Sequence, residues 1–198
     1  MNVLIVLNGE LKSPAFLKEL AGESDYIICA DGGFDKALIA DVTPDLLLGD
    51  MDSVQAEKFN VKTLKYPAEK DWTDCELALK TACDMQADSI VVTCALGGRA
   101  DHEMANLFVL SDFPKACIKE PDTSIYVCDR NLEVCGNGKT FSILPVRDSV
   151  VSVSGAKYSV ENTLFKVGSS LGISNEIVGD KSTVQVKSGK CLVFVNEM

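Results

Sequence analysis

Apolar residues in the first 120 positions fall into short runs that are separated by segments with helical spacing. The runs predict strands at Val3–Leu7, Tyr26–Ala30, Leu46–Leu48, Val61–Tyr66 and Ser89–Ala95. Consecutive apolar positions, in place of strict alternation, are typical of parallel strands that are buried on both faces. Because helical segments lie between the runs, the chain predicts an N-terminal α/β domain with a doubly wound, mostly parallel sheet.

Capping residues mark where the helices between these runs begin. Ser13 followed by Pro14 predicts a helix start, because proline suits the first helical position. Thr73 with Glu76 three residues later forms a capping-box pattern. The expected helices are Pro14–Leu20, Phe34–Leu38, Asp74–Met85 and Asp101–Leu110.

The pattern changes after about Pro121, where β-rich runs separated by turn residues replace the alternation. These runs are Ile125–Cys128, Thr140–Leu144, Val150–Val153, Lys157–Val160, Thr183–Val186 and Cys191–Val195. Several short strands with turn signals between them favour a C-terminal antiparallel β-sandwich or barrel. The sequence therefore predicts two domains, residues 1–121 and 122–198.

Composition excludes several classes of protein. The net charge of −10 over 198 residues argues against a nucleic-acid partner, whose binding depends on basic side chains. No apolar run reaches the length of a membrane span. The eight cysteines include no Cys-x-x-Cys pair and lie mostly in apolar runs, as small core residues do in a reducing compartment. We therefore expect a cytoplasmic protein with no nucleic-acid or membrane partner.

Polar motifs follow the ends of three predicted strands. Asp31-Gly32-Gly33, Gly49–Ser53 and Gly97–Asp101 each come after an apolar run. The carboxyl ends of parallel strands meet at one edge of a sheet, and ligands of open α/β sheets bind there. These motifs therefore predict a shared site.

Two short acidic segments point to a metal ion. Asp50 and Asp52 alternate in one segment, and Asp71 and Asp74 flank Thr73 in the other. Carboxylate oxygens without nitrogen or thiolate ligands favour Mg²⁺, which usually accompanies phosphate. Taken alone, a solvated turn explains Asp50 and Asp52, and helix capping explains Asp74.

The Gly97-Gly98-Arg99 segment precedes a helix and suits an anion. Glycines before a helix expose backbone N–H groups, and Arg99 offers two parallel donors to phosphate oxygens. His102 and Asn106 lie one turn apart on the same helix face. Together with the carboxylates, these residues indicate phosphoryl-type transfer, which needs positioning and charge neutralisation.

Two other patterns are decoys. Gly136–Thr140 ends like a phosphate-binding P-loop, but Glu133 occupies the position of that motif's first glycine. We interpret this segment as a hairpin turn between strands. His102 is the only histidine, so a zinc protease with a paired-histidine motif is excluded.

In order along the chain, these motifs resemble the thiamine pyrophosphokinase family. The matching segments are Ala30–Gly33, Pro44-Asp45, Gly49–Ser53, Lys70-Asp71, Thr73-Asp74, Leu96–Arg99, Asp101-His102, Asn106, Phe141–Leu144, Gly155, Lys157-Tyr158 and Ile173–Glu176. Each motif alone is weak, whereas their order over nearly the whole chain is specific.

The resemblance implies an enzyme that transfers the pyrophosphoryl group of ATP to the hydroxyl of thiamine, giving thiamine diphosphate and AMP. It implies a homodimer with thiamine near the interface. By position, it implies Asp50, Asp52 and Asp71 as Mg²⁺ ligands, Asp31, Lys70, Arg99, His102 and Asn106 at ATP, and Ser174 and Asn175 at thiamine. Asp74 and Asp101 are the candidates for the base that accepts the alcohol proton.

Other functions stay open at this point. They are another Mg²⁺-dependent phosphotransferase or nucleotide hydrolase, or a non-catalytic protein that binds thiamine or a nucleotide. The sequence also leaves open the number of metal ions, the adenine contacts and the aromatic residue that would stack on thiamine. Tyr158 and Phe165 are candidates for that residue, because the only tryptophan, Trp72, lies in the acidic segment.

Overall fold

The computed structural model describes residues 1–49, 61–67, 69 and 71–197. Three predicted site residues, Asp50, Asp52 and Lys70, lie outside the described residues. The described chain forms two compact units. The first contains Met1–Val109 and Ile118–Pro121, and the second contains Leu110–Cys117 and Asp122–Met198.

The first unit alternates strands and helices, as the sequence predicted. Its elements are β1 (Asn2–Val6), α1 (Pro14–Gly22), β2 (Tyr26–Ala30), α2 (Gly33–Ile39), β3 (Leu46–Gly49), β4 (Lys62–Lys65), α3 (Asp74–Asp84), β5 (Ser89–Thr93), α4 (Ala100–Leu110) and β6 (Ala116–Glu120). Strands β5-β1-β2-β3-β4 lie side by side in that order, and each pair is parallel. Among the described residues, no helix combines the length and apolar character needed to cross a membrane.

Both predicted capping residues begin their helices. The Ser13 hydroxyl accepts the N–H of Phe16 at 3.2 Å, and the Thr73 hydroxyl accepts the N–H of Glu76 at 3.2 Å. Each bond satisfies one of the backbone donors that a helix start leaves free. The Glu76 carboxylate pairs with Lys80 at 2.8 Å, one turn further along α3.

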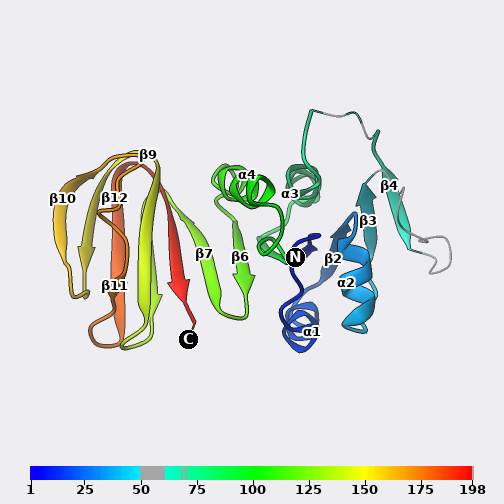
Figure 1. The fold of residues 1–198 in the computed structure, drawn as a ribbon, viewed down its shortest axis with the longest axis horizontal. Helices are drawn as coiled ribbons and strands as arrows, with labels where there is room; N and C mark the ends of the chain where they lie inside the picture. The colour runs from blue at the N-terminus through cyan, green and yellow to red at the C-terminus, as the bar shows by residue number, and fades with distance from the viewer. Residues whose placement is uncertain (50–60, 68, 70, 198) are drawn as a thin grey trace. The chain divides into compact units, whose positions relative to one another are not determined.

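Helices cover both faces of the parallel strands. On one face, Leu17 of α1 and Phe34 of α2 pack in a core cluster with Leu4, Cys29 and Leu47 of the strands. Helix α3 also contacts β1, β2 and β3, and Figure 1 shows it on the opposite side of β1 from α1. This double covering explains the continuous apolar runs of the strands.

The strand order reverses next to β1. The chain proceeds outward from β1 through β2, β3 and β4, and then returns to place β5 on the other side of β1. In sheets of this kind, the reversal separates the loops that follow the two neighbouring strands, which opens a crevice at their carboxyl ends.

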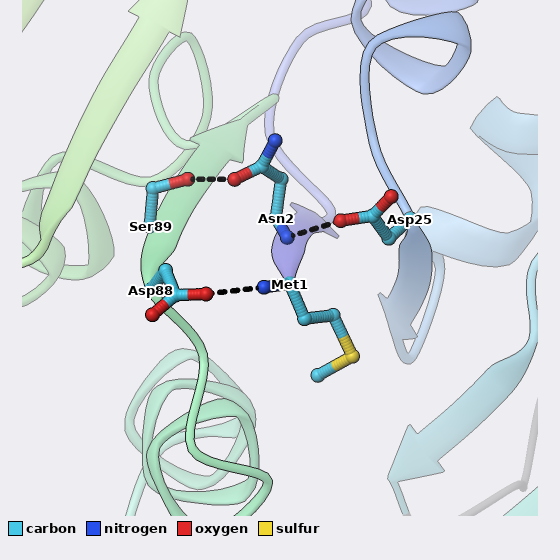
Figure 2. Close-up of polar contacts among 5 residues, drawn as sticks. All are labelled: Met1, Asn2, Asp25, Asp88 and Ser89. Carbon is cyan, nitrogen blue, oxygen red and sulfur yellow. Dashed lines mark hydrogen bonds and ion pairs between the residues drawn. The ribbon is translucent and has the colours of Figure 1, made fainter.

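Polar contacts fasten the opposite, amino-terminal ends of the same strands. Figure 2 shows the Met1 amino group paired with Asp88, the N–H of Asn2 donating to Asp25, and the Ser89 hydroxyl donating to the Asn2 side chain. These contacts join the starts of β1, β2 and β5. Polar contacts therefore tie the amino ends together, and the carboxyl ends are left to carry the loops that follow each strand.

The second unit is antiparallel, as predicted. Its strands are β7 (Thr123–Cys128), β8 (Asn131–Cys135), β9 (Thr140–Ser154), β10 (Val160–Phe165), β11 (Asn175–Glu176) and β12 (Lys181–Asn196). Strand β12 pairs with β7, β8 and β9. Alternate side chains of the long strands, including Phe141, Ile143, Val184 and Val193, enclose one apolar core.

Several strand predictions for the second unit were wrong. The runs at 140–144 and 150–153 belong to the single strand β9, and those at 183–186 and 191–195 belong to β12. The polar residues between the runs lie where the β9–β12 register shifts, from Val186 to Cys191. Bulges let a strand bend without ending, so polar residues in mid-strand resembled turns. Strand β10 begins at Val160, so 157–159 is not strand. Strands β6, β8 and β11 were not predicted.

The hairpin interpretation of residues 136–140 was also wrong. The segment is a turn, in which the N–H of Lys139 donates to the carbonyl of Gly136. However, the flanking strands β8 and β9 both pair with β12. The turn therefore connects two strands that share a partner.

Candidate active site

A cavity of about 600 Å³ lies at the carboxyl ends of the first unit's strands. It is lined by Leu7, Asn8, Gly9, Ala30, Asp31, Trp72, Thr73, Asp74, Cys75, Ala95, Gly98, Arg99, His102, Glu103 and Asn106. These residues follow β1, β2 and β5 or begin α3 and α4. The cavity therefore lies beside β1, where the strand order reverses.

The segments after β1 and β5 form the floor of this region by continuing their pairing. The N–H of Gly9 donates to the carbonyl of Cys94, and that of Glu10 donates to Leu96, both at 2.7 Å. A Cβ atom at Gly9 would lie 2.4 Å from the carbonyl oxygens of Cys94 and Leu96. Only glycine permits this close approach, so the position of the crevice depends on residue 9.

Asp31 lies in the turn between β2 and α2. Its φ of 47° is in the left-handed region, which aspartate tolerates better than most residues. Its N–H donates to the carbonyl of Leu48 at 2.8 Å, and its carbonyl accepts the N–H of Phe34. These bonds hold the turn on the cavity wall.

The start of α3 brings an aromatic ring and a carboxylate to the cavity. Trp72 precedes the Thr73 cap, and Asp74 occupies the first turn, where the helix dipole favours negative charge. Asp71 is exposed and is not among the lining residues. Burial raises the pKa of the Cys75 thiol to about 12, with the charges of Glu76 and Asp74 adding to the effect.

Arg99 and Asp101 form an exposed ion pair at the start of α4. The Arg99 side chain donates to both Asp101 carboxylate oxygens, from Nε at 3.2 Å and from a terminal nitrogen at 2.7 Å. The hydrogen bond from Arg99 lowers the pKa of Asp101, which makes this carboxylate a weaker proton acceptor. Asp101 is not among the lining residues, whereas Asp74 is.

The glycine pair before α4 is capped by the protein itself. The N–H of Gly98 donates to Glu103 Oε1 at 2.7 Å, and the N–H of Glu103 donates to the carbonyl of Arg99. From the sequence alone, such N–H groups are expected to bind an anionic ligand. In this structure the Gly98 donor is already bonded to a carboxylate.

Two side chains hold the peptide groups of Ala95 at the end of β5. The Asn106 amide donates to the Ala95 carbonyl at 2.9 Å, and the buried Glu120 carboxylate accepts the Ala95 N–H at 2.9 Å. Asn106 therefore both lines the cavity and holds the backbone of its wall in place. Glu120 was not singled out from the sequence, because nothing near it in the chain indicates that it bonds to the end of β5.

The second unit places the predicted thiamine residues on and next to β11. Ser174 is exposed, with a φ of 59°, and its N–H donates to the Ser142 hydroxyl. The Asn175 amide is buried and exchanges two hydrogen bonds with the backbone of Tyr158, each 3.0 Å long. The Tyr158 side chain is 62% exposed, whereas Phe165 packs in the core. Of the two aromatic candidates, only Tyr158 is accessible.

The cavity brings together Asp31, Asp74, Arg99, His102 and Asn106 from the predicted set. In the part of the chain that the structure describes, no three His, Cys, Asp or Glu side chains group as a metal site. Two of the three predicted Mg²⁺ ligands, Asp50 and Asp52, lie outside that part. Sequence reasoning missed Asn8 as a lining residue, although it follows the first strand as the other motifs follow theirs.

Comparisons with known proteins place both units in one family. Residues 17–120 match the family model of the thiamin pyrophosphokinase catalytic domain, and residues 127–191 match that of its vitamin B1 binding domain. A thiamine pyrophosphokinase of Bacillus subtilis is 31% identical to this chain, and the alignment covers 87% of this chain and 89% of the relative. Thiamin pyrophosphokinase 1 of Caenorhabditis elegans is 30% identical, and that alignment covers 100% of this chain and 89% of the relative. The crystal structure of a Geobacillus thermodenitrificans thiamin pyrophosphokinase superposes on this structure with a TM-score of 0.85 at 26% sequence identity. The superposition covers 100% of this chain and 98% of the other.

Proposed function

Because the chain belongs to the thiamin pyrophosphokinase family, we propose that the cavity of its first unit is where ATP gives up a pyrophosphoryl group to thiamine. The activity is that of a thiamine pyrophosphokinase, with thiamine diphosphate and AMP as products. The observation that carries the proposal is the match of both family models, in order, to a chain whose cavity lies at the reversal of the strand order.

The reaction forms a bond between the thiamine hydroxyl oxygen and the β-phosphorus of ATP. The bond from the β-phosphorus to the oxygen bridging the α-phosphorus breaks, and AMP leaves with the electron pair. Asp74 is our candidate for the acceptor of the hydroxyl proton, because it lines the cavity and Asp101 is paired with Arg99. Arg99 and His102 would orient the phosphate groups, and Asp31 would lie against the same ligand from the β2 side.

Mg²⁺ fits the donors that are present. Asp71 and Asp74 offer carboxylate oxygens, and the neighbouring Cys75 thiol has a pKa raised to about 12, which disfavours a thiolate ligand. Asp71 would hold the ion together with Asp50 and Asp52. When bound, it would neutralise charge on the triphosphate.

Thiamine and a second subunit complete the proposal. Ser174 and Asn175 would contact thiamine, either directly or, for Asn175, by fixing the backbone of Tyr158. We also propose a homodimer in the cytoplasm. Exposed apolar side chains near Ser174, namely Tyr158, Leu171, Ile173 and Val178, support an interface. The eight cysteines, all within the described residues, form no disulfide, which is consistent with a reducing compartment.

Product analysis tests the function. Incubation with ATP, Mg²⁺ and thiamine should give AMP and thiamine diphosphate in equal amounts, and removal of Mg²⁺ by a chelator should stop both. Release of AMP or ADP at the same rate without thiamine would overturn the proposal in favour of a hydrolase. Tight binding without turnover would favour a non-catalytic protein.

A matched pair of aspartate variants tests the metal assignment. Asp71→Ala should lower turnover by about 10²-fold or more at an unchanged unfolding midpoint. Asp84→Ala, at the far end of α3 and also exposed, should leave turnover unchanged. Near-normal turnover of Asp71→Ala would exclude Asp71 as a metal ligand.

A further inference from the structure

The only tryptophan of the chain lies on the cavity wall. Trp72 is 49% exposed and lines the cavity beside Thr73 and Asp74. Large aromatic side chains are usually buried. A half-exposed indole ring at a cavity therefore indicates a surface available to a ligand. The ring follows exposed Asp71 and precedes a capped helix start, which holds its backbone in place.

The side chain of Lys80, in the second turn of α3, lies over this ring. Lys80 Nζ lies 4.1 Å from the centroid of the Trp72 ring, and Lys80 also pairs with Glu76 at 2.8 Å. An ammonium group over an indole is a favourable cation–π contact. The ring is therefore oriented by the helix, and the positive charge lies close to its π system.

The two substrates bring different rings to the cavity. Thiamine carries a cationic thiazolium ring, and the Lys80 ammonium group beside Trp72 is paired with Glu76, so charge alone does not exclude thiamine from Trp72. The adenine of ATP is neutral, and its triphosphate is attracted by the same ammonium group. Adenine is also a flat ring that stacks well on aromatic side chains.

We infer that Trp72 is the stacking platform for the purine of the nucleotide donor, with Lys80 holding the ring in place. This inference rests on the proposed function, since it assumes that ATP enters the cavity. It adds a specificity residue that none of the sequence motifs assigned.

Tryptophan fluorescence tests the inference directly, because the signal comes from one residue. The wild-type protein is titrated with α,β-methylene-ATP, whose scissile bond is blocked, and separately with inorganic tripolyphosphate and with thiamine. We expect saturable quenching by the nucleotide and little change with the other two. Equal quenching by tripolyphosphate would overturn the inference, since the ring would then report phosphate binding. Quenching by thiamine alone would also overturn it.

Variants supply an independent measurement by calorimetry. Trp72→Leu should weaken binding of α,β-methylene-ATP by about 10-fold, and Trp72→Phe should bind within about threefold of wild type, because a phenyl ring still stacks. The KM for thiamine should stay within about twofold in both. Phe108→Leu is the matched control, because Phe108 is 55% exposed on α4 but does not line the cavity.

The outcomes separate this inference from the proposed function. If wild type makes no AMP in the presence of thiamine, the proposed function fails. If wild type is active and Trp72→Leu binds the nucleotide as tightly as wild type, only the role of Trp72 fails.

Discussion

The two units differ in where their prominent polar side chains lie. In the first unit, Asp31, Asp74 and His102 line a cavity at the ends of the strands. In the second unit, the buried polar side chains Ser149 and Asn175 bond to the unit's own backbone. In these examples, polar groups of the first unit face a cavity, and buried polar groups of the second fix bends and loops. Asn106 and Glu120 of the first unit also bond to backbone, at Ala95.

Sheet topology explains the difference. Parallel strands end at a common edge, so the loops and helix starts that follow them converge there. The long antiparallel strands β9 and β12 instead bend within the sheet, and the displaced backbone groups at each bend need partners. At the β12 bend, the Ser149 hydroxyl accepts the N–H of Lys190 at 2.9 Å.

The largest expected effect tests whether the polar groups of the first unit are catalytic. Asp74→Asn should lower thiamine-dependent AMP formation by about 10²-fold or more, because the amide cannot accept the hydroxyl proton. The free energy of unfolding should change by no more than about 1 kcal/mol, the size of a helix-dipole contribution. Steady-state kinetics and urea unfolding measure the two quantities. Asp101→Asn causing the larger loss would reverse the assignment of the base.

Backbone contact at the cavity floor gives the next largest effect. Gly9→Ala should cost about 3 kcal/mol of unfolding free energy, because its Cβ would overlap two carbonyl oxygens. Gly138→Ala in the second unit should cost only about 1 kcal/mol, since its φ is 78° but no atom lies within 4 Å of the added Cβ. Denaturant titrations of both variants compare them. Equal losses would contradict crowding at Gly9, because its backbone, unlike that of Gly138, does not have a positive φ.

Asn175 tests whether the second unit's polar groups are structural. Asn175→Ala should lower the free energy of unfolding by about 2 kcal/mol, because it leaves the backbone of Tyr158 without partners. Exposed Asn131→Ala should change it by less than about 0.5 kcal/mol. A stable Asn175→Ala protein with a strongly raised KM for thiamine would instead indicate direct contact with the substrate.

The two helix caps form a matched pair within the first unit. Thr73→Ala and Ser13→Ala should each cost about 1 kcal/mol, because each removes one capping hydrogen bond. Only Thr73→Ala should also lower turnover, since its helix start carries Trp72 and Asp74. Thermal unfolding and kinetics would show both effects. Loss of turnover in Ser13→Ala at a temperature where it is folded would contradict this division.

The smallest effect concerns thiol chemistry, which should be alike in the two units. Burial raises the pKa of Cys94 to about 12 and that of Cys128 to about 11. A raised thiol pKa means less thiolate, so at about pH 8 these thiols should alkylate at least 10²-fold more slowly than exposed Cys83 and Cys135. The alkylation rate of Cys94 should keep rising with pH over the whole range in which the protein stays folded. Mass spectrometry of native protein treated with iodoacetamide measures each site, and early labelling of Cys94 would contradict the buried environment.

The first unit was more predictable because its signals are local. The apolar runs of β1 and β2 and the caps Ser13 and Thr73 act within a few residues, and each was in place in the structure. The sequence pattern predicted two strands where β9 and β12 each form one. Their bends are polar, and only pairing with a neighbouring strand keeps them extended. The same limit applied to Asn175, whose partner Tyr158 is distant in the chain.

By itself, the sequence determined the two-part architecture, the edge of the first sheet that carries the cavity, and the family. These follow from hydrophobic periodicity, from helix caps and from the order of short motifs, all of which are written along the chain. Only the tertiary structure decided which of the polar groups reach the cavity. Asp74 lines it and Asp101 pairs with Arg99, Gly98 bonds to Glu103, and Lys80 holds the ring of Trp72. The physical reason is that a side chain's partner depends on distance and direction in space, which the sequence around that residue does not specify.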